Sequence, residues 1–105
     1  MIVERNTDTI AIVERFFTAI DRLKADKIIR GTKTITNRYG MSRWNLLTMK
    51  KDMSHSGQFR AAWMMYLVRD YGVSAHWLLT GEGEFYQRGL SAEKVKKLQI
   101  NCKTK

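Results

Sequence analysis

Apolar residues recur every three to four positions along most of this 105-residue chain, which is the period of an amphipathic helix. One such stripe predicts a long core helix from about residue 9 to residue 25, preceded by a flexible arm at residues 1–8. A broader stripe predicts a second helix at residues 58–71 that is buried on most sides or covered by a partner. Turn formers and charges at residues 51–57, among them His55, predict a loop before it. These patterns predict an all-α fold.

Between the two long helices, residues 32–51 predict two short helices joined by a sharp turn. Their apolar residues fall at helical spacing on either side of a single glycine, at Ile35, Tyr39, Met41, Leu46 and Met49. Gly40 can adopt a positive φ without the steric cost that a side chain would add. Ser42 is placed to cap the following helix by accepting a hydrogen bond from the backbone N–H of Trp44 or Asn45. The turn therefore has both a hinge and a cap.

The same corner occurs twice in the sequence. Residues 71–80, YGVSAHWLLT, repeat residues 39–48, YGMSRWNLLT, with the tyrosine, glycine, serine and closing Leu-Leu-Thr in common. Two such corners predict a compact bundle of about five helices. The second helix of the later copy is cut short by Gly81 and followed by Glu82 and Glu84, which are poor neighbours for an anionic ligand. The later copy is therefore assigned to the core, with three residues as packing: Trp77, Leu78 and Leu79.

Positive charge is concentrated around the first corner. The chain has a formal net charge of +9, and residues 22–51 carry nine cations against the single anion Asp26, a net charge of +8. The nine cations are Arg22, Lys24, Lys27, Arg30, Lys33, Arg38, Arg43, Lys50 and Lys51. Cations concentrated in one segment favour a phosphate-binding face, because neutralising phosphates releases counterions.

Composition argues against several other classes of protein. A chain of this length is one domain by the usual size of domains. The lone Cys102 cannot form an internal disulfide, and no cluster of His and Cys has the spacing of a metal site, so neither a metal nor a cofactor is expected. The sequence contains no apolar run of signal-peptide or membrane-spanning length. We therefore expect a cytoplasmic protein without a membrane contact.

The corner at residues 32–51 resembles the helix-turn-helix of bacterial and phage repressors of the Xre/Cro type, the lambda repressor-like class. Proteins of that type have apolar residues and a turn glycine at the positions that correspond here to Ile35, Tyr39, Gly40, Met41, Leu46 and Met49. One position departs, since Thr36 stands where the family favours alanine or glycine. The segment YGVSAHWLLTGEGEFY also resembles the ending of many small repressor-like proteins. The resemblance implies a DNA-binding domain at residues 9–86 whose second corner helix lies in the major groove.

A sequence-specific transcriptional regulator of double-stranded DNA is the function that this resemblance implies. The expected base-reading residues are Ser42, Arg43, Trp44, Asn45, Leu47 and Thr48, and the expected phosphate contacts are Lys33, Arg38, Lys50 and Lys51. Arg43 is the candidate for a bidentate contact to guanine, Asn45 is a candidate for adenine, and Leu47 with the Thr48 methyl suits thymine methyl groups. Trp44 has two alternatives, packing against the next helix or contacting a sugar or base.

Three other functions remain open at this point. A protein-interaction module, such as an antitoxin or adaptor, would keep the fold and bind an acidic partner. A single-strand binder would place exposed aromatic residues beside the cations, whereas most aromatic residues here fall on core stripes. An enzyme is the weakest alternative, because residues 81–84, GEGE, follow a predicted helix, and no nucleophile, base and orienting group occur together. No catalytic residue is predicted.

The last part of the chain, residues 87–105, is predicted to be a tail. Gly89 breaks the pattern, and a short helix after Ser91 either docks on the domain or on another subunit, or frays. Apolar residues in the last third exceed what one face of a five-helix core should absorb: the broad face of 58–71, Phe85, Tyr86, Val95 and Leu98. We therefore expect a homodimer formed through the C-terminal third, away from the charged segment.

Overall fold

The computed structural model describes residues 2–52 and 59–103, with side chains for 8–52 and 59–99. Over these residues the chain is all-helical, apart from one isolated antiparallel bridge between Val73 and Tyr86. Six helices follow in order: α1 (Ile2–Ala25), α2 (Thr32–Tyr39), α3 (Arg43–Lys51), α4 (Ala61–Tyr71), α5 (Ala75–Thr80) and α6 (Ala92–Lys103). The all-α prediction is thus confirmed for the described part of the chain.

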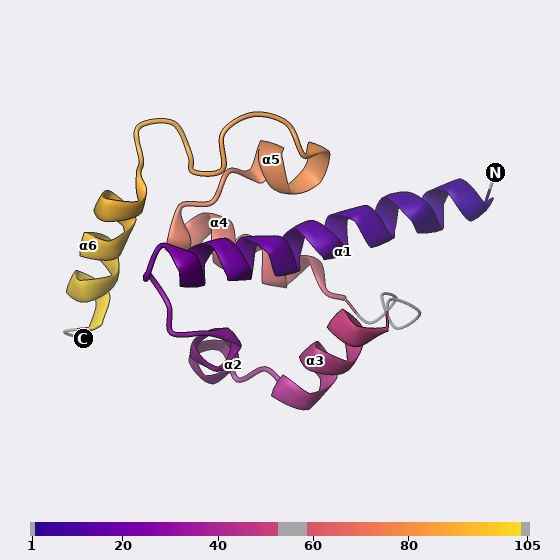
Figure 1. Cartoon of the computed structure of the whole chain (residues 1–105), viewed down its shortest axis with the longest axis horizontal. Coiled ribbons are helices and arrows are strands. Elements are labelled where there is room, and N and C mark those ends of the chain that lie inside the picture. The colour runs from indigo at the N-terminus through magenta and orange to yellow at the C-terminus, as the bar shows by residue number, and fades with distance from the viewer. Residues whose placement is uncertain (1, 53–58, 104–105) are drawn as a thin grey trace.

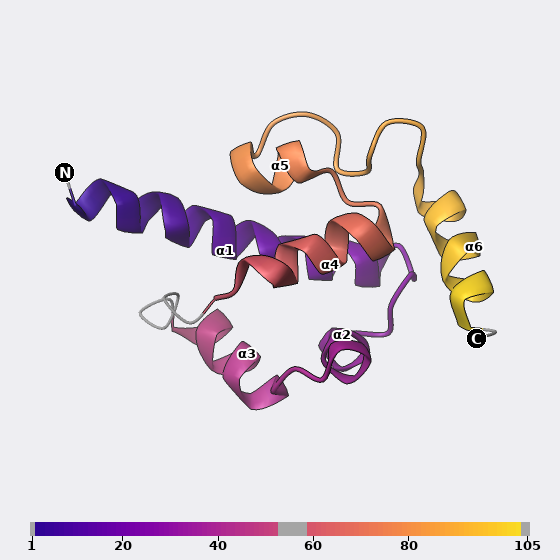
Figure 2. The ribbon, with the colours of Figure 1, turned by 180° about the vertical axis from the view of Figure 1, so that it is seen from behind.

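The other helices are arranged around α1. Figure 1 shows α1 across the middle of the molecule, with α5 along one side, α2 and α3 along the opposite side, and α6 at one end. Figure 2 shows α4 lying against the other face of α1. The buried stripe of α1 meets buried side chains from α2, α3, α4 and α5 in one continuous core. This stripe consists of Val13, Phe16, Phe17, Ala19, Ile20 and Leu23.

Two boundaries differ from the prediction. Helix α1 begins at Ile2, so residues 2–8 continue the helix instead of forming the predicted arm; they contain no glycine or proline to stop it. Helix α4 begins at Ala61, later than the predicted start. Helix α3 ends at Lys51, and the described residues stop at 52 and resume at 59. Most of the predicted loop at 51–57, including His55, therefore lies outside the described residues.

The repeated corner is present in the structure, as predicted. Gly40 and Gly72 each end a helix in the left-handed conformation, with φ of 64° and 67°. The serine two positions later caps the next helix in both copies: Ser42 Oγ accepts from the N–H of Asn45 at 3.2 Å, and Ser74 Oγ accepts from the N–H of Trp77 at 3.3 Å. The same local sequence therefore builds the same turn twice.

Helix α5 packs as predicted through Leu78, whereas the prediction for Leu79 was wrong. Leu78 is buried, and Trp77 packs edge-on against Phe85 with ring centroids 4.9 Å apart. Leu79 is 50% exposed, because one further residue turns the side chain about 100° around the helix. The end of α5 is held from α1, since Arg15 donates to the carbonyl oxygens of Leu78 and Leu79, each at 2.8 Å.

Of the alternatives for the tail, the structure shows a helix docked on the domain. In α6, Val95 and Gln99 are buried. Gln99 donates to the backbone carbonyl of Asp70 at the end of α4 and accepts a hydrogen bond of 2.7 Å from Arg38 of α2. The compact unit therefore extends past residue 86, where the predicted domain ended.

Asp70 joins α2 to α4. The Tyr39 hydroxyl donates to its carboxylate at 2.5 Å, and Arg69 donates to both carboxylate oxygens at 2.9 Å. The hydrogen bonds from Arg69 hold the pKa of Asp70 below its usual range, and the bond from Tyr39 acts in the same direction. The charged form is therefore the one that the folded state prefers.

We expect Asp70→Asn to lower the free energy of unfolding by about 1–2 kcal/mol at neutral pH, because Tyr39 loses a charged acceptor. The folded pKa lies below the unfolded value of about 4, so the carboxylate contribution is present above about pH 4 and is lost as pH falls through the folded pKa. Urea unfolding of the parent and the variant at neutral pH and at about pH 3 measures this. If the difference in unfolding free energy between the parent and Asp70→Asn is the same at both pH values, the charged carboxylate of Asp70 does not stabilise the fold.

Candidate functional site

Helix α3 is anchored by one face and exposes the other. Leu46 and Met49 are buried in the core, whereas Trp44 is 72% and Leu47 38% exposed on the far side. At about 100° per residue, Trp44 and Lys51 lie opposite the buried pair. The predicted base-reading residues accordingly reach the surface of this one helix or its cap: Ser42, Arg43, Trp44, Asn45 and Leu47 are exposed, and Thr48 is half-buried.

The exposure of Trp44 bears on the two alternatives for this residue. The side chain is 72% exposed, so most of its surface is available for a contact and any packing against the next helix is partial. Together with Leu47, Thr48, Lys51 and Asp52 it lines a shallow hollow of about 320 Å³ on the outward face of α3. The Thr48 hydroxyl is already used inside the helix, where it donates to the Trp44 carbonyl at 2.8 Å. The centre of this face is therefore mainly apolar.

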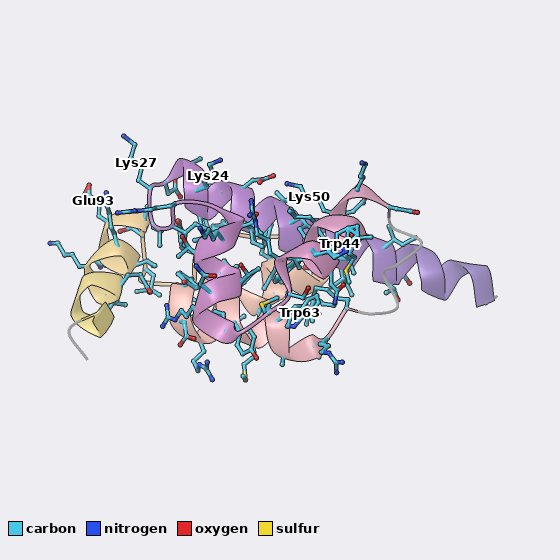
Figure 3. The ribbon with its side chains drawn as sticks, turned by 90° about the horizontal axis from the view of Figure 1, so that it is seen from below. Lys24, Lys27, Trp44, Lys50, Trp63 and Glu93 are labelled. Atoms are coloured by element: carbon cyan, nitrogen blue, oxygen red, sulfur yellow. The ribbon has the colours of Figure 1, made fainter. Side chains whose placement is uncertain are left out.

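Cations border this face. All nine cations of residues 22–51 are at least partly exposed. Figure 3 shows Lys24, Lys27 and Lys50 extending along the same side of the molecule, from the end of α1 to the end of α3. Lys24 and Lys27 contribute to the charge of residues 22–51 but were not among the phosphate contacts predicted from the sequence. Lys27 follows the end of α1 with a φ of 63°, a departure from helical geometry that the sequence does not reveal.

Lys50 forms a contact that the sequence did not predict. Its Nζ lies 3.6 Å from a carboxylate oxygen of Asp21 on α1, and both side chains are largely exposed. An exposed ion pair of this kind contributes little to stability and is weakened by salt. The pair therefore leaves Lys50 able to exchange Asp21 for an external anion. Lys33 and Lys51 are also exposed, as a phosphate contact requires.

Arg38 is exposed, but its guanidinium is also engaged by neighbouring helices, which the sequence did not predict. Its guanidinium donates to Gln99 at 2.7 Å, lies 3.9 Å from the Asp70 carboxylate and stands over the Tyr71 ring at 5.2 Å. These contacts use the side chain to join α2 to α4 and α6. Gln99 is 61 residues away in sequence, which is why local sequence patterns did not reveal this role.

A second hollow, of about 570 Å³, lies between the first corner and α4, with Asn45 and Arg60 among its polar lining. Its aromatic rings pack mainly on one another. Tyr39 and Tyr66 stack in parallel with centroids 3.9 Å apart, and Phe59 meets Trp63 edge-on at 5.2 Å. Rings paired in this way are poor platforms for stacking unpaired bases. The rings of this hollow therefore do not support the single-strand alternative, whereas the exposed Trp44 on α3 remains compatible with it.

Most of the apolar residues expected to form a dimer surface belong to the core of one chain. Phe85, Tyr86 and Val95 are buried in this core, so their use as evidence for a dimer was wrong. Exposed apolar side chains do remain on α4 and α5, where Met65 and Leu79 lie beside a hollow of about 280 Å³ with an entirely apolar lining. Leu98 on α6 is also exposed.

Other site classes find little support among the described residues. In this part of the chain no three His, Cys, Asp or Glu side chains cluster as metal ligands. None of the described helices is both long enough and apolar enough to cross a membrane. Comparison with protein-family models, with curated proteins and with solved structures gives no significant match. The functional argument therefore rests on the geometry of the chain itself.

Proposed function

We propose that this chain is a sequence-specific binder of double-stranded DNA, of the helix-turn-helix, lambda repressor-like class, that acts as a transcriptional regulator. One observation carries the proposal: α3 is fixed to the core through Leu46 and Met49 while its other face exposes the side chains suited to reading bases. An α-helix held in this way fits the major groove of B-DNA. The capped turn between α2 and α3 supports the same assignment.

The surface of α3 divides into a reading part and a positioning part. Arg43, in the first turn, has the planar donor pair that matches the acceptors of guanine, and Asn45 has the amide that matches adenine. The lysines along the neighbouring edge supply phosphate contacts that fix the register without reading sequence. We assign this role to Lys24, Lys27, Lys33, Lys50 and Lys51, and we withdraw Arg38.

Binding to a duplex measured by fluorescence anisotropy across salt concentrations tests the positioning part. Five phosphate contacts give a slope of log K against log salt of about −4 to −5, and Lys50→Ala reduces its magnitude by about one on every sequence. The matched control is Lys96→Ala, an exposed lysine on α6, which leaves the slope unchanged. Equal slopes for the parent and both variants would remove Lys50 from the interface.

A second candidate function, a protein-interaction module for an acidic partner, is favoured by the exposed Trp44 and Leu47. Tryptophan is enriched at the centres of protein interfaces, and neighbouring cations suit an acidic partner. This function predicts no preference among duplex sequences. The regulator is the better supported of the two, because the capped turn and the anchored α3 are the arrangement in which a helix enters the major groove.

We also propose that two copies bind together. One reading helix spans only a few base pairs, and pairing places two such helices about 34 Å apart on successive turns of the major groove. We assign pairing to the apolar hollow between α4 and α5, which is bordered by Met65 and Leu79 and lies within the region expected from the sequence. Light scattering with the protein at tens of micromolar measures whether two copies associate, and footprinting measures how much DNA they protect. A protein that stays monomeric and protects a single half-site would refute the pairing.

A further inference from the structure

The centre of the outward face of α3 has an unusual composition for a surface flanked by lysines. Its most exposed side chains are the indole of Trp44 and the isobutyl group of Leu47. Thr48 completes the lining with its hydroxyl proton already donated to the Trp44 carbonyl. The middle of this helix therefore offers apolar surface where hydrogen-bond donors would serve guanine or adenine.

The charges around this hollow indicate where apolar groups and where phosphates of a bound duplex would lie. Lys51 and Asp52 close it at the C-terminal end with one charge of each sign, so the lining of the hollow has no net charge. The excess of positive charge lies at the neighbouring edge with Lys24, Lys27 and Lys50. A ligand group that enters the hollow is thus expected to be apolar and small, while phosphates take the edge.

In the major groove, the apolar group that a base pair presents is the methyl on C5 of a pyrimidine. We propose that the hollow formed by Trp44 and Leu47 binds pyrimidine C5 methyl groups, so that the preferred duplex carries methylated pyrimidines beneath the centre of α3. This inference rests on the proposed function and adds to it the chemistry of the central positions. Thymine and 5-methylcytosine both present the group.

Replacing thymine by uracil in the preferred duplex removes the methyl and leaves the hydrogen-bonding edges unchanged. At the central positions the parent protein is expected to bind the uracil duplex about fourfold more weakly per methyl. Trp44→Ala and Leu47→Ala are expected to bind the thymine and uracil duplexes equally. Both side chains are exposed, so the variants keep the fold, which circular dichroism verifies.

The internal repeat provides the matched control. His76 occupies in the second corner the position that Trp44 occupies in the first, and it is also exposed. His76→Ala is expected to retain the full discrimination between thymine and uracil. In a second arm, a 5-methylcytosine·guanine pair and an unmethylated cytosine·guanine pair are compared at the same position. The methyl is expected to strengthen binding by about fourfold there as well, which shows that the methyl itself is recognised.

The outcomes separate this inference from the function on which it rests. A clear preference for one duplex with no loss on uracil replacement at any position overturns the methyl contact and leaves the DNA-binding function standing. A discrimination that Trp44→Ala and Leu47→Ala both retain also overturns it, because the methyl is then read elsewhere. No preference among duplexes overturns the function and the inference together, and assigns the exposed pair to a protein partner.

Discussion

Replacing Leu46 with alanine is expected to lower the free energy of unfolding by about 2–5 kcal/mol, a large share of the total of about 5–15 kcal/mol for a domain. Leu46 is fully buried where α3 meets the core, so truncation removes its packing and leaves a cavity. Because the same side chain holds α3 in place, DNA binding is expected to fall with the folded fraction. Urea unfolding with a parallel duplex titration measures both.

Two neighbouring positions make this result specific. Leu47→Ala, one residue later and exposed, is expected to change stability by less than about 1 kcal/mol while weakening duplex binding. Leu78→Ala, at the matching buried position of the second corner, is expected to destabilise as Leu46→Ala does, while the folded fraction binds DNA like the parent. If Leu46→Ala unfolds at the same urea concentration as the parent, α3 is not anchored as described.

Arg43→Ala is expected to weaken binding to the preferred duplex by about 1–3 kcal/mol and to relax the preference at one base pair. The guanidinium is exposed in the first turn of α3, the part of a reading helix that contacts base edges. Competition titrations with the preferred duplex and its single-base variants measure both effects. The loss is expected to vanish on a duplex whose contacted guanine has been replaced.

The matched control for Arg43 is another exposed arginine away from α3. Arg88 lies in the segment between α5 and α6, and Arg88→Ala is expected to keep both the affinity and the base preference. A variant of Arg43 that weakens all duplexes equally would indicate a phosphate contact in place of a base contact. In that case the reading role would pass to the other exposed side chains of α3.

Features that depend on neighbouring residues were predictable from the sequence. The periodic stripe of α1 identified its buried face, and Gly40 with Ser42 identified the turn and the cap because both act within one helical turn. The repeat led to Gly72 and Ser74 by the same reasoning. The exposure of the reading residues followed as well, because the buried positions of a short helix fix its opposite face.

Features that depend on distant residues were not predictable in this way. Arg38 meets Gln99, Lys50 meets Asp21, and α6 buries Val95, all through contacts that join separate helices. Such contacts leave no periodic signal, so the sequence did not reveal that Arg38 joins separate helices or that α6 docks on the domain beyond residue 86. The early start of α1 has another reason, since residues 2–8 lack a helix breaker and the apolar stripe alone marks only the part that is packed.

Selection of bound sequences from a pool of random DNA duplexes, with the whole chain as bait, tests the central claim most directly. The account predicts enrichment of one motif with near two-fold symmetry, its half-sites about one helical turn apart, each with a guanine for Arg43 beside thymines for Trp44 and Leu47. Selection with Arg43→Ala is expected to lose the guanine and keep the thymines. A pool that stays random after several rounds, under salt conditions where the protein still binds DNA, would contradict sequence-specific recognition by α3.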